Sequence, residues 1–154
     1  MIVVLDTNII MDALQERQPF HVAAQEILLR AQNNEFECCF TANSVTDIFY
    51  LYSKARDLAS ARRAIGFLLA TYRIIPVTHD ECTRALSIQV NDYEDALLVV
   101  CSMKTEADFI ISRDKQFPES ELPIKVIEPQ DFLQILTNSN SHSAFSRALC
   151  SRAT

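Results

Sequence analysis

The chain has 154 residues, an apolar fraction of 49% and a formal net charge of −6, values that suit one folded soluble domain with a substantial core. The negative charge argues against a general nucleic-acid coat protein, and no apolar run approaches the ~20 residues of a membrane span. Gly66 is the only glycine. The sequence therefore has no P-loop, GxGxxG turn or GxSxG elbow, which excludes nucleotide kinases, GTPases and dinucleotide dehydrogenases.

Apolar runs alternate with longer helical patterns along the chain. In chain order, they predict a strand over 2–5, helices over 8–14 and 20–32, a strand over 36–40, helices over 44–55 and 58–72, a strand over 73–77, helices over 79–89 and 93–105, strands over 108–112 and 124–127, and a helix over 128–136. Pro76 marks the end of the third strand, and Pro129 lies in the first turn of the last helix.

This alternation predicts an α/β fold with a mainly parallel central sheet of about five strands and helices on both faces. Residues 1–136 are expected to form a single domain. Residues 137–154, "TNSNSHSAFSRALCSRAT", are rich in serine and lack acidic residues, so they are expected to form a C-terminal tail.

The five cysteines are odd in number and form no CxxC pair; they are Cys38, Cys39, Cys82, Cys101 and Cys150. Their mostly apolar surroundings predict reduced core thiols in a cytoplasmic protein. A zinc site is not expected, because adjacent cysteines are poorly spaced ligands and the three histidines are isolated. A signal peptide is not expected either, because the N-terminus has no basic segment and Asp6 interrupts its apolar stretch.

Four aspartates from distant segments are expected at one edge of the sheet. Asp6 ends the first strand and Asp114 follows the fourth. Asp47 and Asp95 are placed in the first turns of the helices over 44–55 and 93–105. Because ligands bind outside the carboxyl ends of parallel strands, these four carboxylates can meet at one site.

The helical aspartates also have a structural explanation. Ser44-x-x-Asp47 and Asp92-x-x-Asp95 resemble capping boxes, and acidic residues in a first turn complement the helix dipole. Asp114 could likewise be a turn residue. For each residue taken singly, capping competes with a functional interpretation.

The N-terminal segment allows both interpretations as well. Thr7 or Asn8 could cap a helix starting near residue 9, with Asp6 fixing the turn, and Asp12 could face solvent. Capping does not explain why Asp6 and Asp114 end two separate apolar strands, and such a carboxylate cluster would repel itself. A divalent cation would remove the repulsion, and ligands made only of hard oxygens indicate Mg²⁺ or Mn²⁺.

Several stretches resemble a PIN domain, in particular bacterial PIN-domain proteins related to VapC-type toxins. They are "LDTNIIMD", "TDIFYLY", "NDYEDALLVVCSMKTEADFIISRDKQF" and "PQDF". The resemblance spans residues 2–136 in order and leaves out the tail. It is most specific in "EDALLVVCSMKTEADFIISRDKQF", where acid, helix, strand and second acid follow the family's spacing. It implies a metal-dependent nuclease whose acidic ligands are Asp6, Asp47, Asp95 and Asp114, with Asn8 as a supporting polar residue.

The acidic set departs from the family in part. Many relatives have Glu at the position of Asp47, so the shorter side chain would reach a metal through water. Asp92 lies three residues before Asp95 on the same side of the helix and is a candidate outer-sphere or extra ligand.

Side chains near the last aspartate are candidate phosphate contacts. Ser112 and Arg113 are placed to touch a substrate phosphate and Lys115 could assist, although Arg113 and Lys115 would also suit a solvated turn. A locally basic stretch could carry the RNA backbone or form a solvated helix face; it contains Lys54, Arg56, Arg62 and Arg63.

The resemblance implies an endoribonuclease that hydrolyses RNA phosphodiester bonds with water activated by one or two Mg²⁺ or Mn²⁺ ions. It further implies the toxin of a toxin–antitoxin pair, with an antitoxin protein as partner and a homodimer as the assembly. Large apolar residues in 47–52 and 65–72 would either pack against a second copy or line the core of one chain. No membrane partner is expected.

Other functions are weighed against this one. A haloacid dehalogenase-type phosphatase needs a second aspartate where this chain has Asn8, which cannot shuttle a proton. A catalytically silent PIN fold that serves binding or assembly is the main alternative, and the intact acids count against it. DNA cleavage stays open, because metal-bound phosphate chemistry does not read the sugar.

Overall fold

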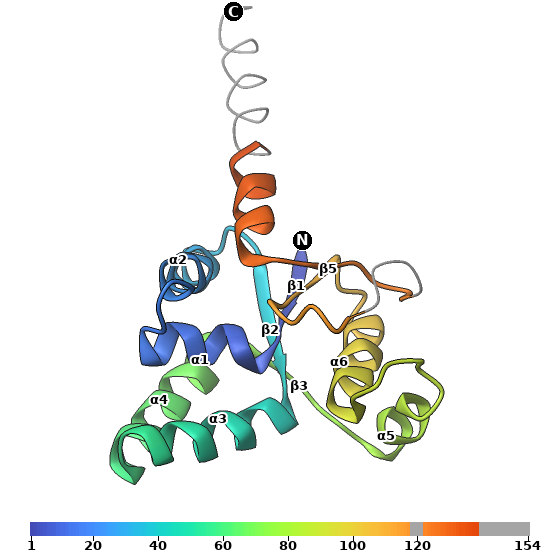
Figure 1. The fold of residues 1–154 in the computed structure, drawn as a ribbon, viewed down its shortest axis with the longest axis horizontal. Coiled ribbons are helices and arrows are strands. Elements are labelled where there is room, and N and C mark those ends of the chain that lie inside the picture. Colours follow the sequence, from blue (N-terminus) through green and yellow to red (C-terminus); the bar gives the residue numbers. More distant parts are fainter. Residues whose placement is uncertain (118–121, 139–154) are drawn as a thin grey trace, which may run out of the picture.

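The computed structural model describes residues 1–117 and 122–138, and it shows a five-stranded sheet between two layers of helices (Figure 1). The strands are β1 (Ile2–Leu5), β2 (Glu37–Thr41), β3 (Arg73–Ile75), β4 (Phe109–Ile111) and β5 (Val126–Ile127). All neighbouring strands are parallel and lie in the order β3-β2-β1-β4-β5. The expected α/β fold with a parallel sheet of five strands is confirmed.

The helices divide between the two faces of the sheet (Figure 1). One layer contains α1 (Thr7–Gln15), α2 (His21–Gln32), α3 (Ala42–Ala55) and α4 (Leu58–Thr71), and the other contains α5 (His79–Ala85) and α6 (Tyr93–Lys104). A helix over 129–138 joins the first layer, because its Phe132 and Leu136 pack into that layer's apolar core.

The central strand β1 supplies both cores. Its Val3 and Leu5 belong to the core beneath α1–α4, whereas Val4 belongs to the core beneath α5 and α6. All three side chains are fully buried. Because alternate residues of a strand point to opposite faces, a strand covered on both sides needs an unbroken apolar run, which "IVVL" supplies.

Helix caps explain why two helices begin earlier than expected. α1 begins at Thr7 because Asp6, not Thr7 or Asn8, is its N-cap. α3 begins at Ala42 because the Thr41 hydroxyl accepts a hydrogen bond from the Ser44 N–H. The expected cap at Ser44 is therefore wrong, and Asp47 lies beyond the first turn of α3.

Some other expectations also need correction. The buried face of α2 is formed by Ala23, Ala24, Ile27 and Ala31, whereas the side chain of Val22 is exposed. The helix expected over 79–89 ends at Ala85. The last described helix extends to residue 138, past the helix end expected at 136. The boundary between domain and tail stays a prediction, because residues 139–154 lie outside the described residues.

The cysteine and membrane expectations can be compared with the described residues. Cys38, Cys39 and Cys101 are buried, and no disulfide involves them or Cys82. Burial raises the pKa of Cys39 and Cys101 to about 11, which keeps these thiols protonated. In the part of the chain that the structure describes, no helix has the length and apolarity needed to cross a membrane.

Candidate active site

The carboxyl ends of β1 and β4 lie side by side and place the first candidate carboxylate. Parallel pairing sets Leu5 beside Ile111, and the Asp6 N–H donates to the Ile111 carbonyl at 3.0 Å. The chain adds β2 and β3 on one side of β1 and then adds β4 and β5 on the other side. Asp6 thus stands at the point where the strand order reverses, the usual place for a ligand site in such a sheet.

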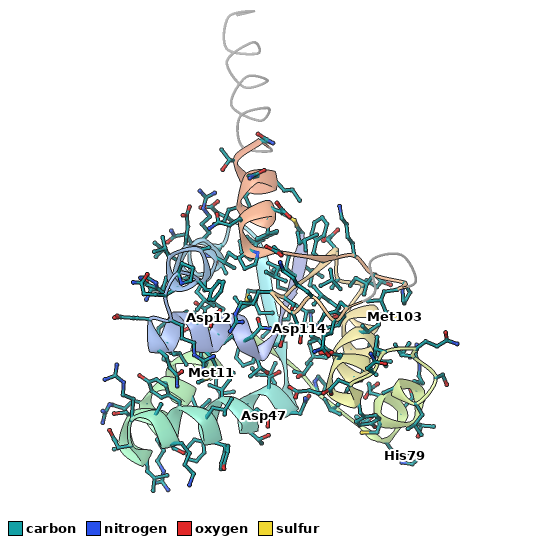
Figure 2. The ribbon with its side chains drawn as sticks, in the orientation of Figure 1. Met11, Asp12, Asp47, His79, Met103 and Asp114 are labelled. Carbon is teal, nitrogen blue, oxygen red and sulfur yellow. The ribbon has the colours of Figure 1, made fainter. Side chains whose placement is uncertain are left out.

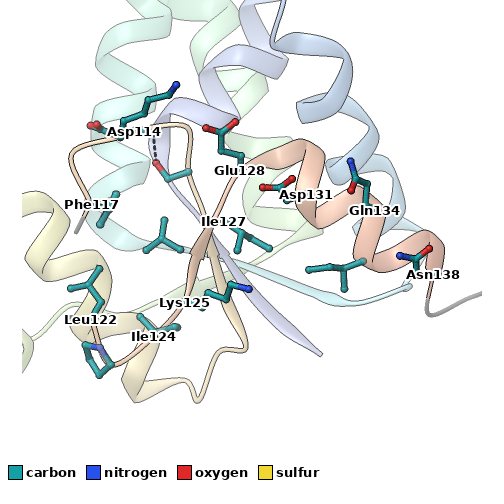
Figure 3. A pocket seen from close by; sticks show the side chains of 15 residues that line it. Asp114, Phe117, Leu122, Ile124, Lys125, Ile127, Glu128, Asp131, Gln134 and Asn138 are labelled. Carbon is teal, nitrogen blue, oxygen red and sulfur yellow. Dashed lines mark hydrogen bonds between the residues drawn. The ribbon is translucent and has the colours of Figure 1, made fainter. Parts of the chain in front are cut away.

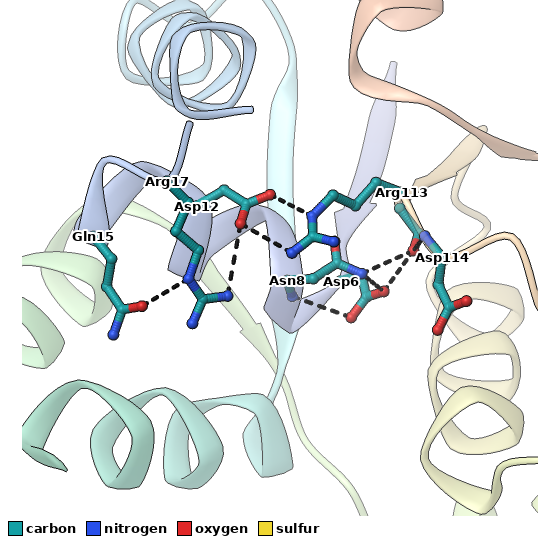
Figure 4. A network of polar contacts seen from close by, with 8 residues as sticks. Asp6, Asn8, Asp12, Gln15, Arg17, Arg113 and Asp114 are labelled. Atoms are coloured by element: carbon teal, nitrogen blue, oxygen red, sulfur yellow. Dashed lines mark hydrogen bonds and ion pairs between the residues drawn. The ribbon is translucent and has the colours of Figure 1, made fainter. Parts of the chain in front are cut away.

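The Asp6 carboxylate is held by two neighbours (Figure 4). The Ser112 hydroxyl donates to Oδ2 of Asp6 at 2.6 Å, and the side-chain amide of Asn8 donates to the same oxygen. The Asn8 amide also donates to Ser112 Oγ at 3.2 Å, and the Asp114 N–H donates to Ser112 Oγ at 2.9 Å. Ser112 is buried and thereby ties Asp6, Asn8 and the turn before Asp114 together.

A second group of acidic residues comes from the start of α6. Asp92 is the N-cap of this helix and accepts a hydrogen bond from the Glu94 N–H at 2.7 Å, as the capping interpretation expected. Glu94 and Asp95 occupy the first turn. Glu94 is linked to the start of α1, because the Thr7 hydroxyl donates to its Oε1 at 3.5 Å.

These segments surround one pocket of about 320 Å³, called the acidic pocket below. Its lining residues are Asp6, Thr7, Asp47, Tyr50, Leu51, Asp92, Glu94, Asp95, Asp114 and Gln116. The four aspartates singled out in the sequence therefore line one cavity, although they come from the residue after β1, from α3, from α6 and from the loop after β4. Figure 2 labels Asp47 and Asp114 on their separate segments. Their catalytic roles stay a prediction.

The acidic pocket concentrates negative charge. Burial raises the pKa of Asp95, and the charges of Asp6, Asp92 and Asp114 add to this effect, so that the pKa is about 7. Burial, followed by the charge of Asp47, also raises the pKa of Glu94. None of the described residues lining the pocket is a lysine or an arginine; Arg113, which is close enough to interact with Asp6 and Asp114, is paired with Asp12.

The donor set fits a hard divalent cation in chemistry. Carboxylate oxygens dominate the pocket, which suits Mg²⁺ or Mn²⁺. Two further oxygens near Asp6 are buried without a partner, Oδ1 of Asn8 and Oδ1 of Asn43, and Asn43 lines a small cavity together with Asp6 and Asp95. With the side chains as they stand, however, no group of three acidic, histidine or cysteine residues in the described segments is arranged to hold a metal.

Arg113 is engaged in an ion pair beside the site. Its Nε and Nη2 donate to the two carboxylate oxygens of Asp12, at 2.6 and 3.2 Å, and its guanidinium lies 4.6 Å from the centre of the Phe20 ring. Asp12 is fully buried and also lies 3.6 Å from Arg17 (Figure 4). The expectation that Asp12 faces solvent is wrong, and Arg113 is not in a solvated turn; its contact with substrate phosphate stays a prediction.

A larger groove of about 910 Å³ adjoins the acidic pocket and shares Asp114 with it; Ser112 lines this groove as well. Figure 3 shows this groove beside β5 and the 129–138 helix. Its walls carry both charges, with Lys115 and Lys125 as well as Glu128 and Asp131. Lys115 therefore faces the groove beside the acidic pocket instead of lining the pocket itself.

Two site residues were missed in the sequence. Glu94 lines the acidic pocket, and its position next to Asp95 at the start of a helix was the available signal. Asn43 carried no signal of its own, because the shift of the α3 start to Ala42 is what brings it into the first turn. From the sequence alone, neither residue could be distinguished from an ordinary polar residue at the start of a helix.

Comparisons with known proteins agree with this architecture. The PIN domain family model matches residues 2–116. Ribonuclease VapC1 from Aquifex aeolicus (strain VF5) is 26% identical over 137 residues, which cover 86% of this chain and 93% of that protein. The match makes this chain similar to that ribonuclease across most of both lengths.

Solved structures share the fold at low sequence identity. A toxin-antitoxin complex from Klebsiella pneumoniae has a chain that is 18% identical, with a TM-score of 0.62 and coverage of 82% of this chain and 97% of that one. VapC20 from Mycobacterium tuberculosis, described as a toxin that cleaves the Sarcin-Ricin loop, is 14% identical, with a TM-score of 0.63 and coverage of 78% and 95%. At these identities the likeness shows the fold.

Proposed function

Because this chain belongs to the PIN domain family, we propose that it is a ribonuclease that hydrolyses RNA phosphodiester bonds with Mg²⁺ or Mn²⁺ at the acidic pocket. The observation that carries the proposal is the convergence of four aspartates from separate segments on one cavity that no described lysine or arginine lines. RNA as the substrate is supported by the name of the 26% identical relative, a ribonuclease.

The residues of the pocket would divide the work between them. A bound divalent cation supplies activation of water and neutralisation of phosphate charge. Asp6 is the central ligand in this proposal, because Asn8 and Ser112 orient its carboxylate. Asp95 and Asp114 would contribute carboxylates from α6 and from the loop after β4.

Asp47 and Asp92 would be the outer members of the acidic set. Asp47 projects from the second turn of α3, and its short side chain suits contact through water. Asp92 is already occupied in capping α6, which favours an outer role. Arg113 would hold the phosphate with the part of its guanidinium that Asp12 leaves free, and Lys115 would meet the strand in the adjoining groove.

We extend the proposal to the biological setting, with the chain as the toxin of a toxin–antitoxin pair. The likeness to a chain of a solved toxin-antitoxin complex supports an antitoxin partner. The cytoplasm is the compartment that fits, because RNA and reduced thiols occur there. Co-purification with the product of a neighbouring gene tests this setting, and toxicity that such a product does not relieve contradicts it.

The catalytic proposal is tested by cleavage of RNA after metal removal and restoration. Protein stripped with EDTA should be inactive on single-stranded and structured RNAs and should regain activity with Mg²⁺ or Mn²⁺. Asp6→Asn and Asp95→Asn should remain inactive, because each loses a charged ligand while keeping its shape. Asp80→Asn is the matched control, since Asp80 is an exposed acidic residue at the start of α5, outside the pocket.

Two results would contradict the proposal in different ways. Equal cleavage by the Asp6→Asn, Asp95→Asn and Asp80→Asn proteins would place the activity in a contaminant or at another site. Failure of the metal-loaded wild type to cut any RNA, structured RNAs included, would instead favour the silent binding module. Cleavage of single-stranded DNA of matching sequence under the same conditions would broaden the substrate class.

A further inference from the structure

One wall of the acidic pocket is neither acidic nor buried. Tyr50 and Leu51 of α3 line the pocket together with Asp47 of the same helix. The Tyr50 residue is 60% exposed and Leu51 is 40% exposed. Because residues three and four apart lie on the same side of a helix, Tyr50 and Leu51 continue the surface that begins at Asp47.

Lys54 extends this surface by one more turn. Its Nζ lies 5.6 Å from the centre of the Tyr50 ring, and it follows Tyr50 by four residues. A carboxylate, an aromatic ring and an ammonium group thus succeed one another along one side of α3, over roughly 10 Å at 1.5 Å per residue. We call this row of Asp47, Tyr50 and Lys54 the α3 row.

The Tyr50 ring is available for a ligand. Among the described residues, Lys54 is the only partner recorded for the ring or its hydroxyl. The hydroxyls of Tyr72 and Tyr93, by contrast, donate to the carbonyls of Leu28 and Cys82. The aromatic face of Tyr50 is therefore packed neither in the core nor against a neighbouring strand or helix.

We propose that Tyr50 stacks against an unpaired base next to the scissile phosphate and that Lys54 pairs with a neighbouring phosphate of the same RNA strand. This inference rests on the proposed ribonuclease function. Aromatic side chains are the usual platforms for bases of single-stranded RNA, since every base has a π-face. The α3 row places such a platform between the proposed metal ligands and a cation.

The α3 row also explains how a negatively charged protein could bind RNA. The chain carries a net charge of −6, and its pocket has no basic lining residue among those described. A metal ion would neutralise the phosphate that reacts but not the flanking nucleotides. Stacking on Tyr50 adds affinity without positive charge, and Lys54 supplies one phosphate contact outside the acidic pocket.

Fluorescence gives a direct test, because the chain contains no tryptophan. Tyr50→Trp in the full chain, combined with Asp6→Asn to prevent cleavage, places a single indole at the proposed platform. Adding a short unstructured oligoribonucleotide should quench its emission in a saturable manner. The matched control is Leu29→Trp in the same background, an exposed site on α2 that does not line the pocket; its emission should not change.

Kinetics give a second, independent readout. In the active protein, Tyr50→Leu should raise KM for single-stranded RNA roughly tenfold with little change in kcat, the loss expected for one base stack. Tyr50→Phe should recover most of that loss, because the ring is retained. Lys54→Gln should raise KM and make binding less dependent on salt.

The outcomes separate this inference from the function on which it rests. Normal KM in Tyr50→Leu, in a protein whose cleavage needs Asp6, overturns the platform and leaves the ribonuclease proposal standing. Saturable quenching of Tyr50→Trp without cleavage by the wild type supports the platform and contradicts catalysis. Emission that changes with protein concentration but not with RNA shows that a second copy of the chain covers Tyr50, which also overturns the platform.

Discussion

Asp6 shows how one residue can satisfy two interpretations that the sequence set against each other. Its carboxylate caps α1 by accepting the Asn8 N–H on Oδ1, while Oδ2 accepts the Ser112 hydroxyl and the Asn8 amide. Carboxylate oxygens have lone pairs to spare for a further ligand. Capping and metal binding are therefore compatible at this position, and the same reasoning applies to Asp92 at the start of α6.

Asp12 is the residue for which a structural role is clearest. Its buried carboxylate faces Arg113 and Arg17, whose side chains are 32% and 37% exposed. Asp12→Asn should lower the free energy of unfolding by on the order of 2–3 kcal/mol, less than for a fully buried pair because water screens both arginines. Urea unfolding measures this, with Asp80→Asn as the control; a loss below about 0.5 kcal/mol would mean that the pair contributes little.

Asp95 should show the opposite effect in metal-free protein. Burial and the neighbouring carboxylates raise its pKa to about 7, so at pH 8 its ionised form is repelled by the pocket. Asp95→Asn should raise Tm in EDTA at pH 8 and should lose most of the stabilisation that millimolar Mn²⁺ gives the wild type. A wild type that melts identically in EDTA and in Mn²⁺ would contradict this.

At the scale of helices and strands, the position of the site depends on where the strands end. The aspartates at the ends of β1 and β4 were predictable, because the apolar runs before Asp6 and Asp114 identify parallel strands and parallel strands end at a common edge. The start of α3 was not. "TANS" offers Thr41 and Ser44 as caps, and the choice depends on pairing of β2 with β3, which ends with Thr41 beside Ile75.

Other features of the site could not be predicted because they depend on contacts between residues far apart in the sequence. The pair of Asp12 and Arg113 joins residues that are 101 positions apart, and no local pattern marks either as the partner of the other. Tyr50 is similar, since its place in the acidic pocket depends on how α3 packs near α6 and β1. The type of each residue was visible in the sequence, whereas its partner was set by the fold.

The junction of α5 and α6 should respond to acid. Glu81 is buried, accepts hydrogen bonds from the N–H and hydroxyl of Thr78, and lies 2.8 Å from Lys104. Lys104, followed by Thr78, lowers the pKa of Glu81 from 4.5 to about 2. Because the folded pKa lies below the unfolded value, this stabilisation is complete above about pH 4.5 and is lost as pH falls toward 2.

Glu81→Gln tests this junction. The variant should be less stable than the wild type at pH 7, and the difference should shrink between pH 4.5 and 2 as the wild type becomes protonated. Urea unfolding at a series of pH values measures both quantities. A difference that stays constant over this range would show that the charge of Glu81 is not what stabilises the junction.

At the scale of the whole molecule, the apolar surface on α4 is larger than one chain buries. Leu68 is buried, but Leu58, Phe67 and Leu69 are 61%, 49% and 50% exposed. The alternative that all of 65–72 lines the core of one chain is therefore wrong. Leu58 and Leu69 lie three turns apart on the same side of the helix, whereas Phe67 lies on nearly the opposite side. We propose that the side of α4 with Leu58 and Leu69 forms a two-fold homodimer, because an isologous contact lets one apolar patch cover itself.

The dimer is tested by light scattering. The wild type should have the mass of two chains at micromolar concentration, and Leu69→Lys should shift it to one chain, because the two copies of this lysine would lie in the same apolar contact. Val22→Lys on the exposed side of α2 is the control for an added charge. A wild type that stays monomeric at high concentration contradicts the proposal.

Diffraction from crystals grown with Mn²⁺ tests whether the acidic pocket is a divalent metal site. Anomalous scattering locates manganese without reference to any assumed role for the side chains. A manganese peak should appear in the acidic pocket, within bonding distance of Asp6 and at least one of Asp95 and Asp114, and no such peak should appear in Asp6→Asn crystals. A wild-type pocket that stays empty in millimolar Mn²⁺, or a peak bound only elsewhere on the molecule, would contradict this prediction.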